Sequence, residues 1–320
     1  MMESKEQIQA ASHREKLREL FKRLSESDVN NETGFSADKD AILKVFENTK
    51  NETKEDILVR LTLIDSMYST QMSRRYYALE ELAEFLAILS EGKQGKLRQK
   101  FLDFVKEPEK KLSFFNSIFK ERDEKGELVE VKKNLFSECY GIGKDGRRKG
   151  VAISLISKYA YFETDFQFPI YDSIACEMYP LVWCHCGFDK KSMPKLKCYN
   201  DEGNILGDKT IVEYVKAVNV IIEKLESSHL NYDRFDRFLW FVGKIRRGNL
   251  SLVLSREDYL STINLYHPQK YNVKTRKGKT KSVTEYFNIN NVEIYKLSYL
   301  DNNPLLREFF EFAQYYGHTK

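Results

Sequence analysis

Apolar residues recur three and four positions apart along most of the chain, which is the spacing of one face of an α-helix. In residues 10–24 this face is formed by Leu17, Leu20, Phe21 and Leu24. The same spacing predicts helices at residues 39–47, 55–72, 76–89, 97–105, 111–119, 132–140, 147–162, 173–179, 210–227, 232–244 and 305–316. Helices joined by short turns predict an all-α fold.

Three segments depart from the helical pattern. Residues 122–131 are densely charged and predict a turn or a short hairpin. Residues 166–171 are expected to be extended, because Pro169 disfavours a helical conformation in the residue before it. Residues 265–282 are basic and irregular, and we expect a surface segment there.

Composition narrows the class of protein. With 320 residues, 42% of them hydrophobic, the chain can bury a large core and is long enough for about two domains. No stretch approaches the roughly 20 apolar residues that span a bilayer, and residues 1–23 lack the apolar core of a signal peptide. We therefore expect a cytoplasmic protein, in a bacterial cytosol or nucleoid, with no membrane partner. Its five cysteines then read as free thiols.

Basic residues are concentrated at residues 144–149 and 270–281, although the net charge is only +4. One concentration, at residues 144–149, follows a turn that contains Gly141 and Gly143. Two glycines let the backbone bend tightly, and exposed amide groups near a helix start bind phosphate oxygens. Lys144, Arg147 and Arg148 would add charge to this contact. The alternative is a plain connection between two helices with a solvated basic end.

Asp172 is the main candidate for chemistry. It precedes a helix and follows an apolar and aromatic run at residues 168–171, which predicts a helix N-cap that is partly buried. Backbone amides of the capped helix would keep its carboxylate ionised, and a fixed anion stabilises a developing cation. Asp-Ser before a helix is more often a simple cap, so that alternative stays open.

Two lysines are candidates for an amine nucleophile. Lys149 is predicted at the first turn of the helix at 147–162, where the positive helix end disfavours the ammonium form. Lys158 lies in the last turns of that helix and is closer in sequence to Asp172. Both are ordinary surface lysines in the alternative interpretation.

A polar helix end, Ser69-Thr70-Gln71, precedes Arg74 and Arg75. Such a residue can enter a minor groove and fill the gap left by a displaced base. Taken with the glycine turn and Asp172, in this order, the chain resembles the helix-hairpin-helix DNA glycosylase superfamily, which includes endonuclease III and the 8-oxoguanine glycosylases. The resemblance covers roughly residues 57–179.

The resemblance implies two helical domains with a cleft between them and a helix-hairpin-helix motif at about residues 133–162. One domain would span residues 55–165, and the other residues 1–54 and 166–320. It implies an enzyme that binds double-stranded DNA as a monomer without a cofactor, flips one base and cleaves its N-glycosidic bond. The substrate would be an oxidised base in repair or a modified base in defence against phage.

The resemblance also assigns roles to individual residues. Gln71 would fill the vacated stack, the hairpin amides with Arg147 and Arg148 would hold phosphate, and Asp172 would stabilise the cationic sugar. A lysine in reach of C1′ would add strand cleavage through a Schiff base. Flipped bases stack on rings, and the candidate pocket walls are Tyr159, Phe162, Tyr171 and Trp240.

The chain departs from the family in two respects. Residues 144–148 separate the hairpin glycines from Lys149, whereas the family lysine follows directly, so the choice between Lys149 and Lys158 stays open. The four-cysteine iron–sulfur pattern is absent, and Cys184-His185-Cys186 with distant Cys198 lacks a zinc spacing, so no metal is expected. Two rivals remain: a non-catalytic DNA-binding protein that keeps the hairpin, and a helical interaction protein without a nucleic-acid role.

Overall fold

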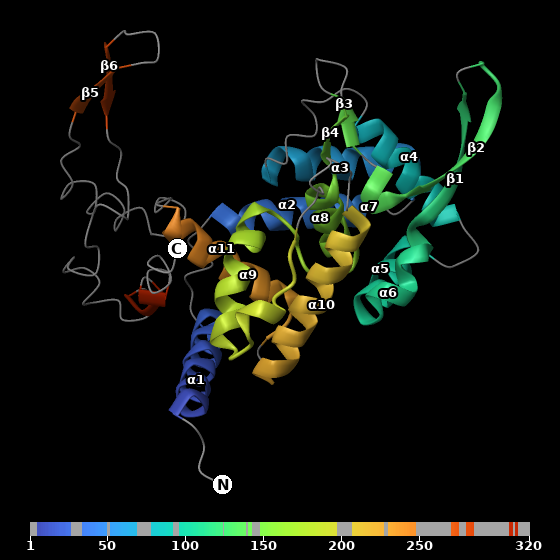
Figure 1. The fold of residues 1–320 in the computed structure, drawn as a ribbon. Helices are drawn as coiled ribbons and strands as arrows, with labels where there is room; N and C mark the ends of the chain where they lie inside the picture. The colour runs from blue at the N-terminus through green and yellow to red at the C-terminus, as the bar shows by residue number, and fades with distance from the viewer. Residues whose placement is uncertain are drawn as a thin grey trace.

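A computed structural model describes residues 5–26, 34–49, 52–68, 78–91, 96–123, 125–138, 140–142, 148–196, 207–226, 230–247, 270–274, 280–284, 307–309 and 311–312. The chain is mostly helical, as predicted, and it also contains three two-stranded antiparallel hairpins (Figure 1). Within the described ranges, no helix is long and apolar enough to cross a membrane.

The helices of the first half are α1 (Lys5–Glu26), α2 (Gly34–Asn48), α3 (Lys54–Tyr68), α4 (Ala78–Glu91), α5 (Leu97–Lys106), α6 (Pro108–Lys111), the 3-10 helix η3 (Leu112–Phe115) and α7 (Leu135–Glu138). Those of the second half are α8 (Ile153–Glu163), α9 (Ser173–His185), the 3-10 helix η4 (Lys190–Ser192), α10 (Gly207–Leu225) and α11 (Tyr232–Arg246). The strands are β1 (Asn116–Arg122), β2 (Leu128–Asn134), β3 (Tyr140–Ile142), β4 (Arg148–Val151), β5 (Lys270–Lys274) and β6 (Thr280–Thr284).

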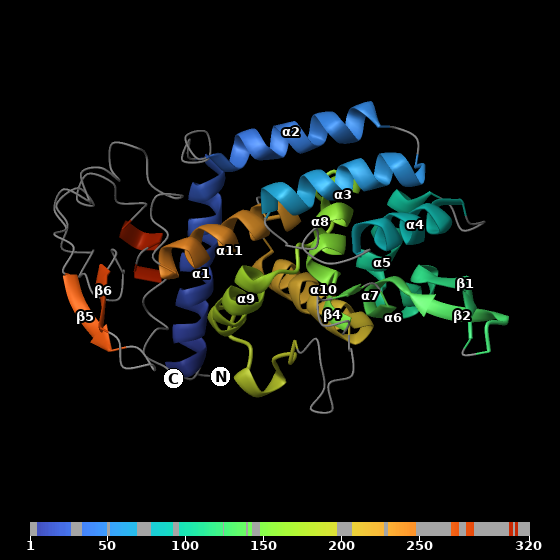
Figure 2. The ribbon, with the colours of Figure 1, turned by 90° about the horizontal axis from the view of Figure 1, so that it is seen from above.

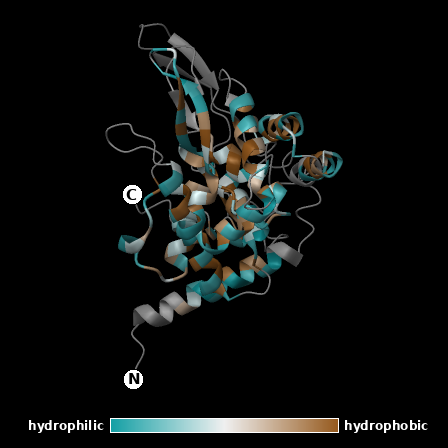
Figure 3. Ribbon diagram, turned by 90° about the vertical axis from the view of Figure 1, so that its right-hand side faces the viewer, coloured by the Kyte–Doolittle hydropathy of each residue, from teal (hydrophilic) through white to brown (hydrophobic). Residues whose placement is uncertain are grey.

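Helix α8 lies inside the molecule, because its side chains are buried on nearly every face. It packs against α2, α3 and α5. Helices α9 and α11 pack on each other, and α1 from the start of the chain lies against both of them (Figure 2). In Figure 3 the hydrophobic positions gather where helices face one another. The predicted division into two domains stays a prediction.

The β1–β2 hairpin corrects two predicted helices. Residues 116–119 begin β1 and residues 132–134 end β2, so the helices predicted at 111–119 and 132–140 were wrong over these residues. The rest of the two ranges is partly helical, since Lys111 ends α6, residues 112–115 form η3 and residues 135–138 form α7. Side chains pair across seven registered positions, and Gly126 turns the chain with a positive φ of 80°. The hairpin predicted in the charged segment is confirmed, and Figures 1 and 2 show it projecting from the helices.

The described residues on both sides of the glycine turn form strands. The helix expected from Arg147 begins at Ile153, and Arg148–Val151 instead form β4, which pairs with β3. Lys149 is therefore opposite Gly141 in a strand, and its predicted place in the first turn of a helix was wrong. Gly150 is a poor helix residue, and strand pairing gives the backbone groups around it an alternative to the helix.

Candidate functional site

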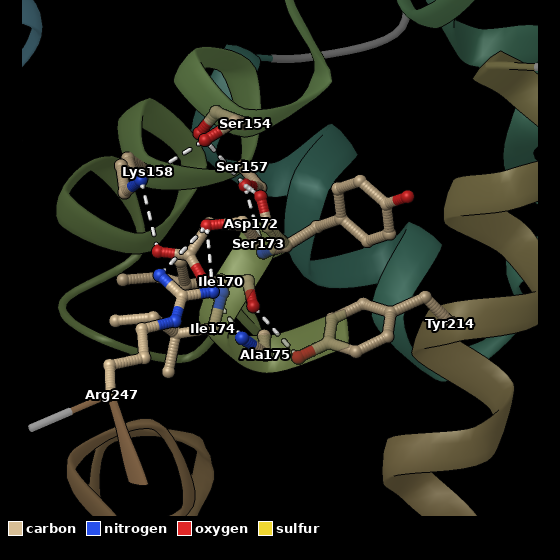
Figure 4. Close-up of polar contacts among 11 residues, drawn as sticks. Ser154, Ser157, Lys158, Ile170, Asp172, Ser173, Ile174, Ala175, Tyr214 and Arg247 are labelled. Atoms are coloured by element: carbon tan, nitrogen blue, oxygen red, sulfur yellow. Dashed lines mark hydrogen bonds and ion pairs between the residues drawn. The ribbon is translucent and has the colours of Figure 1, made fainter. Parts of the chain in front are cut away.

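Asp172 is the N-cap of α9, as its sequence context predicts. Its Oδ1 accepts hydrogen bonds from the backbone N–H groups of Ile174 and Ala175, each at 2.9 Å. The cap residue has extended backbone angles, φ −147° and ψ −176°, which are usual for this position. Two of the unsatisfied amides of the first turn are thereby used, and one carboxylate oxygen is held in place (Figure 4).

The segment before Asp172 is fixed against α8 and α10 through its backbone. The Ser157 hydroxyl accepts from the Tyr171 N–H at 3.0 Å and lies 3.2 Å from the Tyr171 carbonyl, to which it can donate. The Tyr214 hydroxyl donates to the Ile170 carbonyl at 2.7 Å. These contacts set the position from which Asp172 enters α9, so the carboxylate is oriented by buried neighbours rather than by a free loop.

Lys158 completes the centre of the site from α8. Its Nζ lies 3.3 Å from Asp172 Oδ2 and 3.0 Å from the Ser154 hydroxyl, and it stands 5.4 Å from the centroid of the Tyr68 ring. The Lys158 side chain is 4% exposed and the Asp172 side chain is 24% exposed. The structure therefore brings Lys158 to the carboxylate and leaves one edge of Asp172 open.

The electrostatic balance keeps Asp172 ionised. Burial by itself would raise the pKa of Asp172, but the charge of Lys158 and the amides of Ala175 and Ile174 outweigh it, so the pKa lies below the ordinary value. The carboxylate is consequently an anion at neutral pH. It is rigidly held, paired on one side and accessible on the other, and this arrangement suits the stabilisation of a transient cation.

Helix α11 adds a polar face that was not predicted from the sequence as one surface. Asp233, Asp236, Trp240, Lys244 and Arg247 recur at spacings of three and four, so they share one side of the helix. Arg237 lies on the same side, and only Trp240 had been predicted as a site residue. The helical spacing was a usable signal, but it did not show that this face turns toward Asp172.

Two contacts show how closely α11 approaches the start of α9. A Cβ added to Gly243 would stand 2.4 Å from Cγ2 of Ile174, so only glycine lets the helices meet here. At the end of α11, the Arg247 guanidinium lies 3.3 Å from the Ser173 hydroxyl and 2.9 Å from the Glu177 carboxylate. Arg247, the last residue of the polar face, thus lies beside the residue that follows Asp172 (Figure 4).

A second buried lysine–aspartate pair lies at the other end of α11. Lys39 Nζ is 2.6 Å from Asp233 Oδ1, which also accepts from the Tyr161 hydroxyl. The ammonium stands 3.5 Å from the centroid of the Phe166 ring. Burial lowers the pKa of Lys39, although Asp233 opposes that shift. This pair ties α2, α8 and α11 together, and the sequence analysis missed it because its members are far apart in the chain.

The four aromatic residues predicted to line a base pocket differ in how far they are buried. Tyr159 and Phe162 are buried in the core, and the Tyr159 hydroxyl accepts from Arg60, so neither ring presents a surface to a base. Tyr171 is 7% exposed and packs against Tyr214. Trp240 is half-buried on the polar face of α11, with Lys244 Nζ 5.6 Å from its ring centroid. Trp240 is therefore the best placed of the four.

Most of the predicted DNA contacts lie outside the described residues, namely Gln71, Gly143, Lys144 and Arg147. Gly141 is in β3 and Arg148 is in β4, opposite Ile142. Among the residues that the structure describes, no group of three or more His, Cys, Asp and Glu side chains could hold a metal ion. Cys176, Cys184 and Cys186 are free thiols. Comparison with protein-family models, curated proteins and solved structures found no match to the chain.

Proposed function

We propose that this chain is a DNA glycosylase, which flips a damaged or modified base out of duplex DNA and cleaves its N-glycosidic bond. The observation that carries the proposal is the fixed anion at the start of α9. Asp172 accepts hydrogen bonds from two amides of the helix that it caps, is paired with buried Lys158 and is still partly exposed. Breaking an N-glycosidic bond leaves positive charge on the sugar, and a preorganised carboxylate lowers the energy of that state.

The order of elements supports the proposed DNA contact. Helix α7, the β3–β4 hairpin and α8 follow one another directly before Asp172. We take them as the helix-hairpin-helix unit, within a fold of two helical domains that hold the DNA between them. The hairpin carries the glycine turn and its basic residues, including Arg148, which would contact phosphates on one strand. Asp172, which pairs with Lys158 of α8, would meet the extruded nucleotide.

The pair of Lys158 and Asp172 bears on the question of strand cleavage. An amine that attacks C1′ must have a free lone pair, and the Lys158 Nζ is instead engaged by Asp172 at 3.3 Å and by the Ser154 hydroxyl at 3.0 Å. Simple hydrolysis, with Asp172 orienting the attacking water, follows more directly from these contacts. Borohydride treatment during turnover should then trap no adduct, and an adduct that disappears in Lys158→Ala would establish a Schiff base instead.

The proposal is tested by base release from duplexes that each carry one 8-oxoguanine, 7-methylguanine or 5-hydroxymethylcytosine. We expect release from at least one duplex by the wild type and a loss of about 10²–10³-fold or more in Asp172→Asn, since removal of one preorganised charge-stabilising group has effects of this size. Glu177→Gln, at the exposed ion pair with Arg247, is the matched control and should retain activity. Equal release by the wild type and Asp172→Asn would exclude this role of Asp172.

DNA binding is measured separately by gel shifts in rising salt. Affinity for duplex DNA should fall steeply with salt concentration if several phosphates are contacted. Binding without release of any base would favour a non-catalytic DNA-binding protein. Absence of salt-dependent binding would contradict any role on DNA.

A further inference from the structure

Asp236 lies on the polar face of α11 and belongs to neither buried ion pair. It is one helical turn after Asp233 and one turn before Trp240. The residue as a whole is half-buried, and its carboxyl group lies on the inner side of the helix. The contacts at the two ends of α11 indicate what this carboxyl group faces.

At the start of α11, Asp233 contacts Tyr161 of α8. Lys158 precedes Tyr161 by three residues and therefore lies on the same side of α8. At the end of α11, Arg247 contacts Ser173, the residue after Asp172. Asp236 is thus placed between these two anchoring contacts, along the stretch of α11 that passes the Lys158–Asp172 pair.

The electrostatics agree with this placement. Burial raises the pKa of Asp236 well above its ordinary value, and the nearby charge of Asp172 raises it further. Lys158 and Lys39 oppose the shift, and Asp233 adds to it. The groups on the packed elements that interact electrostatically with Asp236 are Lys39 on α2, Lys158 and Tyr161 on α8, Asp172 before α9 and Tyr214 on α10. Two neighbouring carboxyls with opposite pKa shifts are suited to different roles in one reaction.

We propose that Asp236 is the general acid of this site and protonates the departing base, while Asp172 remains the anion that faces the sugar. This inference rests on the proposed glycosylase function. It names a second carboxyl group for the same reaction and implies a substrate base that leaves as a neutral molecule only after it gains a proton.

The proposed reaction transfers one proton from Asp236 to the base and one proton from water to Asp172. The N-glycosidic bond breaks, its electron pair goes to the base, and a ring nitrogen or oxygen of the base takes the proton of Asp236. Water then forms a bond to C1′ and gives a proton to Asp172. The products are the free base and an abasic sugar with a hydroxyl at C1′, and exchange with solvent restores a protonated Asp236 and an ionised Asp172.

The first test needs no DNA. An infrared difference spectrum between the wild type and Asp236→Asn at neutral pH should contain the carbonyl stretch of one protonated carboxylic acid. Asp233→Asn is the matched control, because the pKa of Asp233 is lowered by Lys39 and Tyr161 despite its burial. That difference spectrum should lack the band. A carboxylate signal in place of the acid band for Asp236 would overturn the proposal.

The second test compares two leaving groups. In 7-methylguanine the base is already cationic and leaves without protonation, whereas 8-oxoguanine is neutral. Asp236→Asn should slow release of 8-oxoguanine by about 10²–10⁴-fold, the usual contribution of general acid catalysis, and should change release of 7-methylguanine little. Wild-type release should also decline as pH rises through the pKa of Asp236, because the acid is then lost.

The outcomes distinguish a failure of the acid role of Asp236 from a failure of the glycosylase function. Equal losses for both bases in Asp236→Asn would reject the acid role and leave the glycosylase function intact. No release of 8-oxoguanine, 7-methylguanine or 5-hydroxymethylcytosine by the wild type, together with the acid band in the infrared spectrum, would reject the function instead. Asp236→Glu, which keeps the acid group, should recover part of the rate for 8-oxoguanine and none if Asp236 only maintains packing.

Discussion

The most informative perturbation of the site removes Lys158 and Asp172 singly and together, because it separates what the pair contributes to stability from what it contributes to chemistry. The two side chains are 3.3 Å apart, and the Lys158 side chain is 4% exposed. Removing one partner of a buried pair costs about 3–5 kcal/mol, because the remaining charge is uncompensated. Asp172 is 24% exposed and Asn also caps helices, so we expect Asp172→Asn to cost about 2–3 kcal/mol.

The assay is urea unfolding of the wild type, Asp172→Asn, Lys158→Met and the double variant. The double variant should be more stable than the sum of the single changes predicts, by about 1.5–2 kcal/mol, because it leaves no buried charge unpaired. It should nevertheless remain inactive. The exposed pair of Lys216 and Glu109, at 2.8 Å, is the control and should show coupling below about 1 kcal/mol. Additive effects within about 0.5 kcal/mol for Asp172 and Lys158 would refute this account of the pair.

Three further expectations concern the fold and the DNA contact. Burial, partly offset by Arg60, raises the pKa of Glu163 from 4.5 to about 7, so its contribution to stability is present below pH 4.5 and is lost as pH rises through 7. The free energy of unfolding should fall by about 3 kcal/mol over this pH range, and Glu163→Gln should abolish that fall when urea unfolding is measured at each pH. The same dependence on pH in the wild type and the variant would contradict this expectation. Gly243→Ala should destabilise the chain by about 1–3 kcal/mol in the same assay, since its methyl group meets Ile174, and an unchanged midpoint would show that the helices can separate freely. Arg148→Gln should reduce the salt slope of DNA binding in gel shifts by about one unit, and an unchanged slope would exclude a phosphate contact there.

The local features of the site were readable from the sequence. Asp-Ser before an apolar helix predicted the N-cap at Asp172, because capping depends only on the residues of one turn. The helical content followed in the same way from periodic apolar residues. By contrast, residues 116–119 continue a helical pattern but join a hairpin, because pairing with β2 outweighs their local preference.

The features that depend on contacts between distant segments were not readable. The contact of Lys158 with Asp172 depends on the position of α8 relative to α9, and the extended backbone at Lys149 reflects its pairing with Gly141. The polar face of α11 was visible as a spacing, but its approach to Asp172 depends on the close contact at Gly243. Tyr159 is an aromatic residue of the kind that lines base pockets, and only its contacts place it in the core.

The central claim is that Asp172 is a fixed anion positioned to meet a cationic sugar. It is tested most directly by the affinity of the protein for two duplexes, one with a positively charged pyrrolidine in place of an abasic sugar and one with neutral tetrahydrofuran. The wild type should bind the cationic duplex at least about 10²-fold more tightly, as expected for a transition-state mimic, and Asp172→Asn should lose most of this preference. Equal affinity of the wild type for the two duplexes would contradict the claim.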